Sequence, residues 1–316
     1  MRRREFTGVL AASLASAAAI QPANKNVKWG LSLGLWSHYP RTPFTDVLDV
    51  MRDTGFIGLR VAGYPGLLQR WDITPAHIEK ELAKRKLRLI SVSCGGPLHL
   101  PDQRAKVLAD VKTVAEFAKS LGAGHLTLFS PSRTKPGENR DKAFKELCER
   151  CNQIGELVGA MGLAVGVHNH LDHMIEQAEE VDRLFACTNP KLVGFTPGTA
   201  HLQLAGVNVP ECLEKHKDRL RRVVDYKDAK WRKPKQDWTE PNGKVYPQDS
   251  RQARFLNSIN DLGDGEIDFV ACHRVIKSIN YKGWICVDLD VARKGPLASY
   301  ERCGAYVVNK LEPVYL

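Results

Sequence analysis

The sequence predicts a single α/β barrel in which eight parallel strands alternate with helices. The chain has 316 residues, 43% of them hydrophobic, which is enough for one large core or for two smaller domains. Eight short apolar runs rich in β-branched residues recur at intervals too long for hairpins, with helix-period segments between them. Strands that alternate with helices form a parallel sheet, and eight such units close a barrel. No segment has the composition of a linker, so we expect one domain.

The predicted strands are spread over the whole chain. They are GLSLGLW (30–36), IGLRVAG (57–63), RLISVSC (88–94), HLTLFSP (125–131), LAVGVHN (163–169), LVGFTP (192–197), RRVVDYK (221–227) and WICVDLD (284–290). Helices are expected between them at 44–55, 76–86, 107–123 and 178–189, where apolar residues follow the helical period. Several of these segments end in Gly or Asn, which are common at helix C-termini.

The interval between the seventh and eighth predicted strands is the irregular one. Residues 230–266 are polar and contain three prolines, so we expect a long loop there. Loops of that length in a compact domain usually act as lids or binding segments.

The basic residues are scattered rather than gathered on one surface. The formal net charge is +10, with basic runs at 84–86, 215–222 and 230–235. No helix face combines them with interleaved aromatic residues, as a nucleic-acid groove would require. We therefore expect a solvated basic surface and no nucleic-acid partner.

Residues 1–20 have the order of a secretory signal. Arg3 and Arg4 precede Glu-Phe, as in twin-arginine signals, and a mildly apolar run of small residues follows and ends near Ala19. The run is too short and too rich in Ala and Gly to span a membrane. We expect a periplasmic or otherwise exported protein whose barrel domain covers 21–316. The alternative is a frayed basic N-terminus.

The eight cysteines carry little metal-binding signal. Cys148 and Cys151 form a C-x-x-C motif, but it lies inside the amphipathic helix pattern FKELCERCNQIGELV and has no second pair. Most of the cysteines are therefore expected to be small buried hydrophobic residues, although export would allow thiols to oxidise.

Polar residues concentrate at the carboxyl ends of the apolar strands, where the catalytic groups of such barrels lie. Three of them, in AVGVHNHLDHM (164–174), are histidines within six positions, and neutral imidazole is both a metal ligand and a proton carrier. The expected members of this set are His38, Arg60, Pro131, Ser132, Arg133, His168, Asn169, His170, His201, Asp225, Lys227, Asp288 and Asp290. Such a concentration predicts a site at the mouth of the barrel.

Five blocks in order carry a family resemblance: HNHLDHMIEQAEEVDRLF, GFTPGTAHLQLAGVNV, RRVVDYKDAKW, LGDGEIDF and YKGWICVDLD. They resemble the sugar phosphate isomerase/epimerase superfamily of xylose-isomerase-like TIM barrels, over roughly residues 30–312. The inosose-dehydratase-like members look most similar, because they also place a histidine cluster at the end of the fifth strand. The resemblance implies a xylose-isomerase-like (β/α)8 barrel that acts on sugars or cyclitols.

The resemblance also implies a divalent ion, Mn, Co, Mg or Zn, held at the barrel mouth by one ligand from each of strands five to eight. Carried over by position, the ligand places fall on His168, Gly198, Asp225 and Asp288. Gly198 has no ligand atom, so His201 or water would have to fill its place. Imidazole with two carboxylates suits such ions. The alternative is a barrel that has lost the metal.

Roles for the other residues follow from the same resemblance. Asp288, His168 and Lys227 are the expected catalytic residues, since carboxylates and imidazoles move protons and the family lysine lies near substrate oxygens. The expected substrate contacts are His38, Arg60, His170, His201, Lys227 and Trp284. Trp284 would form the apolar floor on which a sugar ring stacks, and Asp268 would cap the last helix.

Three functions are weighed on these grounds. The leading one is an exported, metal-dependent isomerase, epimerase, dehydratase or lyase that removes a proton next to the carbonyl of a sugar, cyclitol or keto-sugar. The alternative is a non-catalytic carbohydrate-binding barrel. The third is an endonuclease IV-like DNA repair enzyme, which would need many more zinc ligands than the strand ends of this sequence offer. We expect a small carbohydrate as partner and no membrane span in the mature chain. Whether the protein forms a homo-oligomer does not follow from the sequence.

Overall fold

The computed structural model describes residue 20 and residues 25–316. The predicted signal segment therefore lies, apart from Ile20, outside the described residues. Among the helices of the described part, none is both long and apolar enough to cross a membrane.

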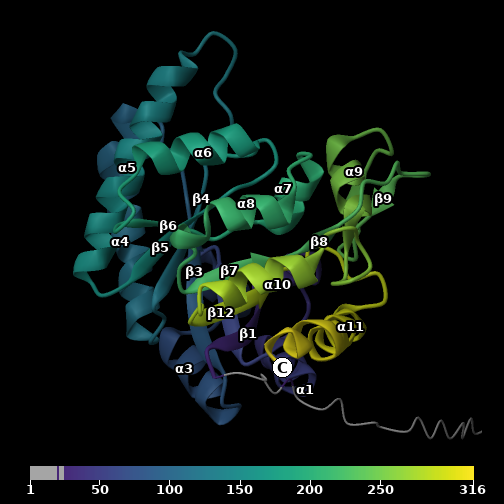
Figure 1. The fold of residues 1–316 in the computed structure, drawn as a ribbon. Coiled ribbons are helices and arrows are strands. Elements are labelled where there is room, and N and C mark those ends of the chain that lie inside the picture. The colour runs from purple at the N-terminus through teal and green to yellow at the C-terminus, as the bar shows by residue number, and fades with distance from the viewer. Residues whose placement is uncertain (1–19, 21–24) are drawn as a thin grey trace, which may run out of the picture.

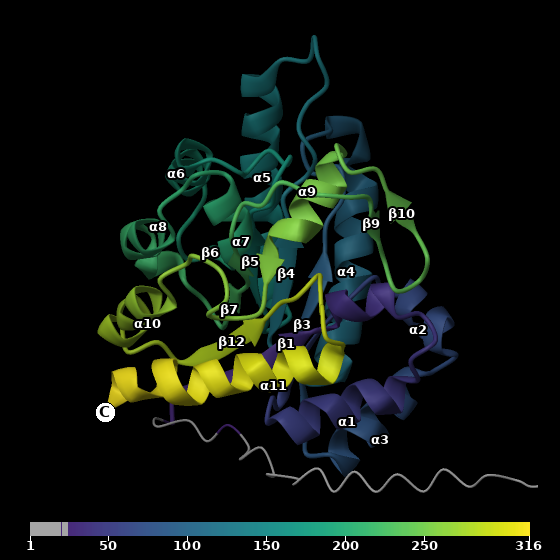
Figure 2. The same ribbon diagram turned by 90° about the vertical axis from the view of Figure 1, so that its right-hand side faces the viewer.

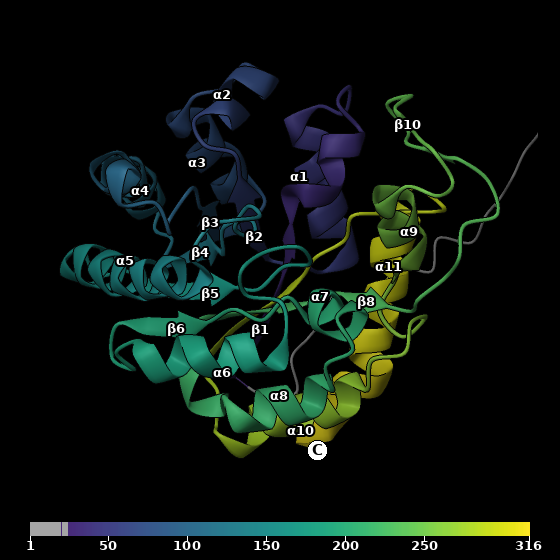
Figure 3. The same cartoon turned by 90° about the horizontal axis from the view of Figure 1, so that it is seen from above.

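Eight parallel strands form a nearly closed barrel surrounded by helices (Figures 1 and 3). The strands are β1 (Val27–Ser32), β2 (Gly58–Ala62), β3 (Arg88–Cys94), β4 (His125–Phe129), β5 (Ala164–His168), β6 (Val193–Phe195), β7 (Val223–Tyr226) and β12 (Gly283–Val287). Their order is β6-β5-β4-β3-β2-β1-β12-β7, so sequence neighbours pair throughout. Each of the eight predicted strands is confirmed.

The edges of this sheet meet at a thinly bonded seam between β6 and β7. Two isolated parallel bridges join them, Phe195 with Leu220 and Gly198 with Asp225.

The first predicted strand, 30–36, is the least accurate in its bounds. The observed strand β1 ends at Ser32, and Leu33–His38 form a 3-10 helix, η1. The Ser32 hydroxyl caps the first turn of η1.

The helices alternate with the strands and cover the outside of the barrel (Figure 3). They are α1 (Phe44–Thr54), α2 (Gly66–Trp71), α3 (Pro75–Lys84), α4 (Arg104–Ser120), α5 (Arg140–Ala160), α6 (Ala178–Cys187), α7 (Thr199–Leu204), α8 (Val209–Lys215), α10 (Phe269–Ser278) and α11 (Pro296–Tyr306). All four helix ranges expected from the sequence are confirmed. Asp268 accepts the Ala271 N–H at 2.9 Å and so caps a helix, as predicted, but that helix is α10 and not the last one, α11.

The segment 230–266 is not a plain loop, which corrects the expectation from its polarity. It contains a hairpin, β9 (Trp238–Thr239) and β10 (Val245–Tyr246), followed by α9 (Arg251–Ser258). The strand β11 (Ile259–Asn260) then pairs with β8 (Asp228–Ala229). These elements are short, and apolar residues such as Leu256 and Ile259 pack against α7 in a small separate core. Such short elements leave no long periodic signal in the sequence.

The end of this insert is fastened by a buried carboxylate. Asp228 accepts backbone N–H groups of Gly263, Gly265 and Ile267 at 2.9–3.2 Å. Figure 2 shows α9 and the hairpin β9–β10 together at the upper end of the barrel. The insert is therefore an ordered wall beside the barrel mouth.

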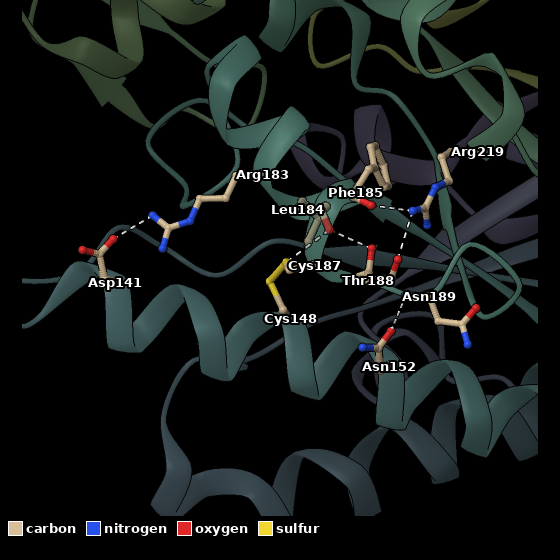
Figure 4. Close-up of a disulfide and its surroundings, with 10 residues drawn as sticks. All are labelled: Asp141, Cys148, Asn152, Arg183, Leu184, Phe185, Cys187, Thr188, Asn189 and Arg219. Atoms are coloured by element: carbon tan, nitrogen blue, oxygen red, sulfur yellow. Dashed lines mark hydrogen bonds and ion pairs between the residues drawn. A yellow bond between two sulfur atoms is a disulfide. The ribbon is translucent and has the colours of Figure 1, made fainter.

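A disulfide joins two of the outer helices. Cys148 of α5 and Cys187 of α6 are bonded, with their Cα atoms 5.9 Å apart (Figure 4). Cys151, the other half of the C-x-x-C motif, is a free buried thiol. Of the six free cysteines, five are buried, in agreement with the expectation that most of them are small core residues.

Candidate active site

A cluster of buried charges lies at the mouth of the barrel. Arg60 lies in β2, Asp225 in β7, Lys227 directly after β7, and Asp288 and Asp290 directly after β12. Arg60, Asp225, Lys227 and Asp288 are each no more than 5% exposed. Because charged side chains are almost never so buried unless they are paired, their arrangement must be accounted for by partners.

The partners are the opposite charges within the cluster. The terminal Nη2 of Arg60 lies 3.0 Å from Asp288 Oδ1 and 3.4 Å from Asp225 Oδ2. Lys227 Nζ lies 2.7 Å from an oxygen of Asp288 and 2.7 Å from one of Asp290. Asp288 is thus held between two cations, and each cation is shared by two carboxylates.

This pairing decides the protonation states. Burial alone would lower the pKa of Arg60, yet Asp225 and Asp288 raise it above its ordinary value. Burial likewise opposes the charge of Lys227, but Asp288 and Asp290 raise its pKa. Burial would raise the pKa of Asp288, whereas Lys227 and Arg60 hold it well below the usual range. All three groups are therefore charged at neutral pH.

A cluster of four histidines lies beside these charges. His168 ends β5, His170 and His173 lie in the loop after it, and His201 lies in α7. The rings of His170 and His201 are 3.8 Å apart between centroids, and Phe255 of α9 stacks on His201 at 5.4 Å. Burial lowers the pKa of His170 to about 3 and holds that of His201 well below its ordinary value. These two imidazoles are therefore neutral at physiological pH, and burial opposes their protonation.

The proton of His168 has a defined place. Its Nδ1 lies 3.0 Å from the carbonyl oxygen of Thr196 and 3.3 Å from Asp225 Oδ2. Since both neighbours are acceptors, Nδ1 carries the proton of the neutral ring and Nε2 is left with a lone pair. Nε2 is buried and has no hydrogen-bond partner among the described residues, nor has either ring nitrogen of His201. Unpartnered buried polar atoms of this kind call for a ligand or water.

A small cavity opens beside the charge cluster. Its volume is about 320 Å³, within the range of small-molecule pockets. It is lined by Leu35, His38, Tyr39, Trp238, Thr239, Glu240, Pro241, Leu256, Asp290, Val291, Ala292 and Arg293. The insert 230–266 therefore supplies one wall, and the loops after β1 and β12 supply the others.

An acid and a histidine meet in this cavity. Glu240 is only 4% exposed, and its Oε1 lies 3.0 Å from His38 Nδ1. Burial would raise the pKa of Glu240, but His38 and Asn242 hold it below its ordinary value. A carboxylate, an imidazole and the Trp238 ring offer the polar contacts and the apolar face that a polyhydroxylated ring requires.

Most of the residues predicted from the sequence are brought together at the mouth. Arg60, His168, Asp225, Lys227 and Asp288 share the charge cluster, directly or through one contact. The ring of His170 lies tilted beside His168 and that of His201 lies edge-on to it, and His38 reaches the cavity. Their catalytic and binding roles remain predictions.

The prediction that Trp284 contacts the substrate is corrected, because this residue lies away from the barrel mouth. Trp284 is the second residue of β12 and lies at the opposite end of the barrel. Its backbone N–H donates to the carbonyl oxygen of Arg222. A side chain at Gly58 would meet its ring at 2.6 Å, so the tryptophan fills the barrel floor. It lines another cavity there with Lys28, Arg88 and Arg222. A strand's first residues face away from the carboxyl end, whatever their type.

Sequence reasoning missed three residues of the insert. Trp238, Glu240 and Phe255 lie at the cavity or against the histidines. All three belong to the segment expected to be a loop, so nothing fixed their direction. The signal available was the interruption of this polar stretch by acidic and aromatic residues.

The divalent ion implied by the resemblance does not fit the residues present. In the described part of the chain, no three His, Cys, Asp or Glu side chains are arranged to hold a metal. Asp225 and Asp288 face the guanidinium group of Arg60 instead. His168 and His201, the other predicted ligands, are 5.8 Å apart between ring centroids.

The missing ligand at Gly198 cannot be restored by a simple side chain. A Cβ atom there would lie 2.8 Å from the carbonyl oxygen of Asn169 and 2.9 Å from His168 Nε2. Asn169 also fixes this backbone, because its Oδ1 accepts the Gly198 N–H at 2.8 Å. The chain at this position is packed against the histidine rather than open toward an ion.

Comparisons with known proteins agree with this architecture. The model of the xylose isomerase-like TIM barrel family matches residues 48–302. The inosose dehydratase of Lactiplantibacillus plantarum is 26% identical over 316 residues, covering 92% of this chain and 98% of that protein. The inosose dehydratase of Bacillus licheniformis is 32% identical over 250 residues, covering 75% and 77%.

A solved structure shows the same fold at low identity. The IOLI protein, crystallised with a zinc atom, has a TM-score of 0.69 and 12% identity, and the match covers 90% of this chain and 99% of that one. At that identity the likeness concerns the fold.

Proposed function

Because the chain belongs to the family of xylose isomerase-like TIM barrels, we propose that it is an enzyme acting on a cyclitol or sugar that bears a carbonyl group. Its curated relatives named above are inosose dehydratases, so dehydration is the first reaction to consider. Isomerisation and epimerisation begin with the same step, removal of the proton on the carbon next to the carbonyl.

The observation that carries the proposal is the state of His168. Its Nδ1–H donates to the Thr196 carbonyl, which fixes the tautomer and leaves Nε2 as the basic atom. Asp225 Oδ2 lies 3.3 Å from the same Nδ1 without a hydrogen bond, and a carboxylate so close stabilises the imidazolium that forms when the ring takes a proton. His168 is therefore the proposed base.

The rest of the site suits the other demands of the reaction. After proton removal the negative charge moves to the carbonyl oxygen, and the cations of the cluster stabilise it. The imidazolium then returns its proton, to a leaving hydroxyl in dehydration or to carbon in epimerisation. The cavity lined by His38, Trp238 and Glu240 would hold the remaining hydroxyl groups of the ring.

The test is exchange of a substrate proton with solvent. Purified protein incubated in D₂O with inososes and keto-sugars is expected to place deuterium on the carbon next to the carbonyl, measured by NMR, and to release water from its substrate, measured by mass spectrometry. His168→Gln should slow exchange by about 10²–10⁴-fold, the usual contribution of a general base.

The matched control is His216→Gln. His216 also pairs with an aspartate, Asp182 at 2.9 Å, but it lies between the outer helices α6 and α8. This variant should exchange at the wild-type rate. If the wild type binds such carbohydrates without exchange or turnover, the barrel is a carbohydrate-binding protein and the proposal fails.

We also propose that the protein is exported through its twin-arginine-type segment. The Cys148–Cys187 disulfide supports this, because structural disulfides persist in oxidising compartments such as the periplasm. Replacing Arg3 and Arg4 together with Lys should leave the protein in the cytoplasm, as judged by cell fractionation. Arg2→Lys, which keeps the pair, should be exported normally. Periplasmic recovery of the double variant would rule the pathway out.

A further inference from the structure

We infer that Arg60 takes the place of the divalent ion, so that this enzyme stabilises the carbonyl oxygen of its substrate with a guanidinium group and without a bound metal. The inference rests on the proposed function for its chemistry, but its statement about the occupant of the site rests on contacts alone. The inference concerns the four side chains of Arg60, His168, Asp225 and Asp288.

Arg60 occupies the position expected for the ion. An ion held from the ends of β7 and β12 would lie between Asp225 and Asp288. One nitrogen of Arg60 already lies 3.4 Å from the former and 3.0 Å from the latter. A metal bound at about 2.0–2.2 Å from the same oxygens would have to share this space with the guanidinium group.

The charges at this position favour the same conclusion. Asp225, Asp288 and Asp290 bring three negative charges, and Arg60 and Lys227 bring two positive ones through contacts of 2.7–3.4 Å. Arginine is not deprotonated in proteins, so its charge cannot be removed to admit a cation. Arg60 and Lys227 thus offset two of the three carboxylate charges, and a dication would have to compete with the fixed charge of Arg60 for Asp225 and Asp288.

The side chain of Arg60 is held firmly in its position between the two carboxylates. Its side chain projects from the middle of β2, is 3% exposed, and donates through Nη1 to Ser93 Oγ at 3.3 Å. Its Nε–H has no hydrogen-bond acceptor among the described residues. The guanidinium is thus fixed by its neighbours, and one of its N–H donors is left without an acceptor among the described residues.

A metal ligand is also missing in the loop after β6, at Gly198. Gly198 provides no side chain, and the packing of its backbone against His168 and Asn169 leaves no room for one. Both residues point to the same conclusion. Gly198 removes a ligand of the ion, and Arg60 supplies the positive charge that the ion would have brought.

The chemistry balances without a metal. His168 Nε2 takes the proton next to the carbonyl, the C–H electron pair becomes a carbon–carbon double bond, and the carbonyl π electrons move to oxygen. N–H groups of Arg60 donate to that oxygen. In dehydration the electrons then expel the β-hydroxyl group, which the His168 imidazolium protonates to water. The base is regenerated, and no oxidant or reductant takes part.

The test begins with the wild-type protein, expressed with manganese, cobalt and zinc supplied. Elemental analysis is expected to find far less than one ion per chain. Exhaustive chelation should leave deuterium exchange unchanged, and adding each metal should leave the Tm unchanged. One tightly held equivalent of metal, whose removal lowers Tm or abolishes exchange, would overturn the inference.

The second arm removes the arginine. Arg60→Met keeps an apolar stem but frees Asp225 and Asp288 from their shared cation. This variant is expected to acquire metal affinity, so that zinc or cobalt at about 100 times its Kd raises Tm by about 5 °C, whereas the wild type does not respond. Without metal its exchange rate should fall about 10²–10³-fold, the usual cost of one oxyanion donor.

The matched control is Arg85→Met. The Arg85 side chain is also only 7% exposed and also bridges two carboxylates, Asp49 and Glu81, but on the outer helices α1 and α3. It should be destabilised without gaining a metal response. If Arg60→Met does not fold, the wild-type measurements still decide. Exchange that requires metal sinks the inference and leaves the proposed function standing, whereas a metal-free protein with no exchange on any substrate sinks only the function.

Discussion

Lys227→Met is expected to lower kcat/KM by about 10²–10³-fold, as the loss of a cation that stabilises developing negative charge does. The same change should destabilise the fold by about 3–5 kcal/mol, because it removes one partner of a buried ion pair. Lys227 Nζ lies 2.7 Å from both Asp288 and Asp290, and its side chain is 4% exposed. Methionine preserves the length of the side chain but leaves both carboxylates short of a partner. Urea unfolding and steady-state kinetics measure the two effects.

The control for this change is Lys230→Met, three residues along the chain. Lys230 pairs with Glu266 at 2.8 Å, but both side chains are 47% exposed. Exposed pairs contribute about 0–1 kcal/mol, so this variant should unfold near the wild-type midpoint and keep its activity. Equal losses in the two variants would show that burial of the Lys227 cluster has no special part in stability or turnover.

Replacing Cys148 and Cys187 together with Ser is expected to cost about 4 kcal/mol of stability, from the entropy of closing a loop of this length. The two residues are 39 positions apart and tie α5 to α6 on the outside of the barrel. The crosslink restricts the unfolded chain, so the effect belongs mainly to the unfolded state. Chemical denaturation with and without a reductant measures it.

Cys151→Ala is the matched control for the disulfide. Cys151 lies in the same helix and is a buried free thiol. This variant should keep its sensitivity to reductant, whereas the double serine variant should have none. If denatured wild-type protein reacts as eight free thiols rather than six, the disulfide is absent and the predicted loss does not apply.

The sequence predicts the fold well because the barrel is written in local patterns. Each strand is an apolar run and each long helix an amphipathic one, so all eight strands could be placed without knowing any contact. The insert 230–266 was misjudged because its elements are two to eight residues long. Elements so short are defined by the packing around them.

The site could be located from the sequence, but its chemistry could not. The carboxyl ends of the strands place His168, Asp225 and Asp288 at the mouth. That Arg60 would reach Asp288 depends on side-chain directions in strands 228 residues apart in the chain, β2 and β12, and no pattern records them. The pairing of Cys148 with Cys187 was open for a similar reason, since spacing alone does not determine connectivity.

The seam between β6 and β7 has a consequence for motion. Elsewhere in the barrel, neighbouring strands share ladders of at least three residue pairs, but here only the bridges of Phe195 with Leu220 and Gly198 with Asp225 close the ring. Amide groups with few ladder partners open at low free energy, so the barrel should breathe first along this line. The Gly198 bridge lies directly over the buried Nε2 of His168. We therefore expect access of a ligand to that nitrogen to depend on opening of the barrel wall at this seam.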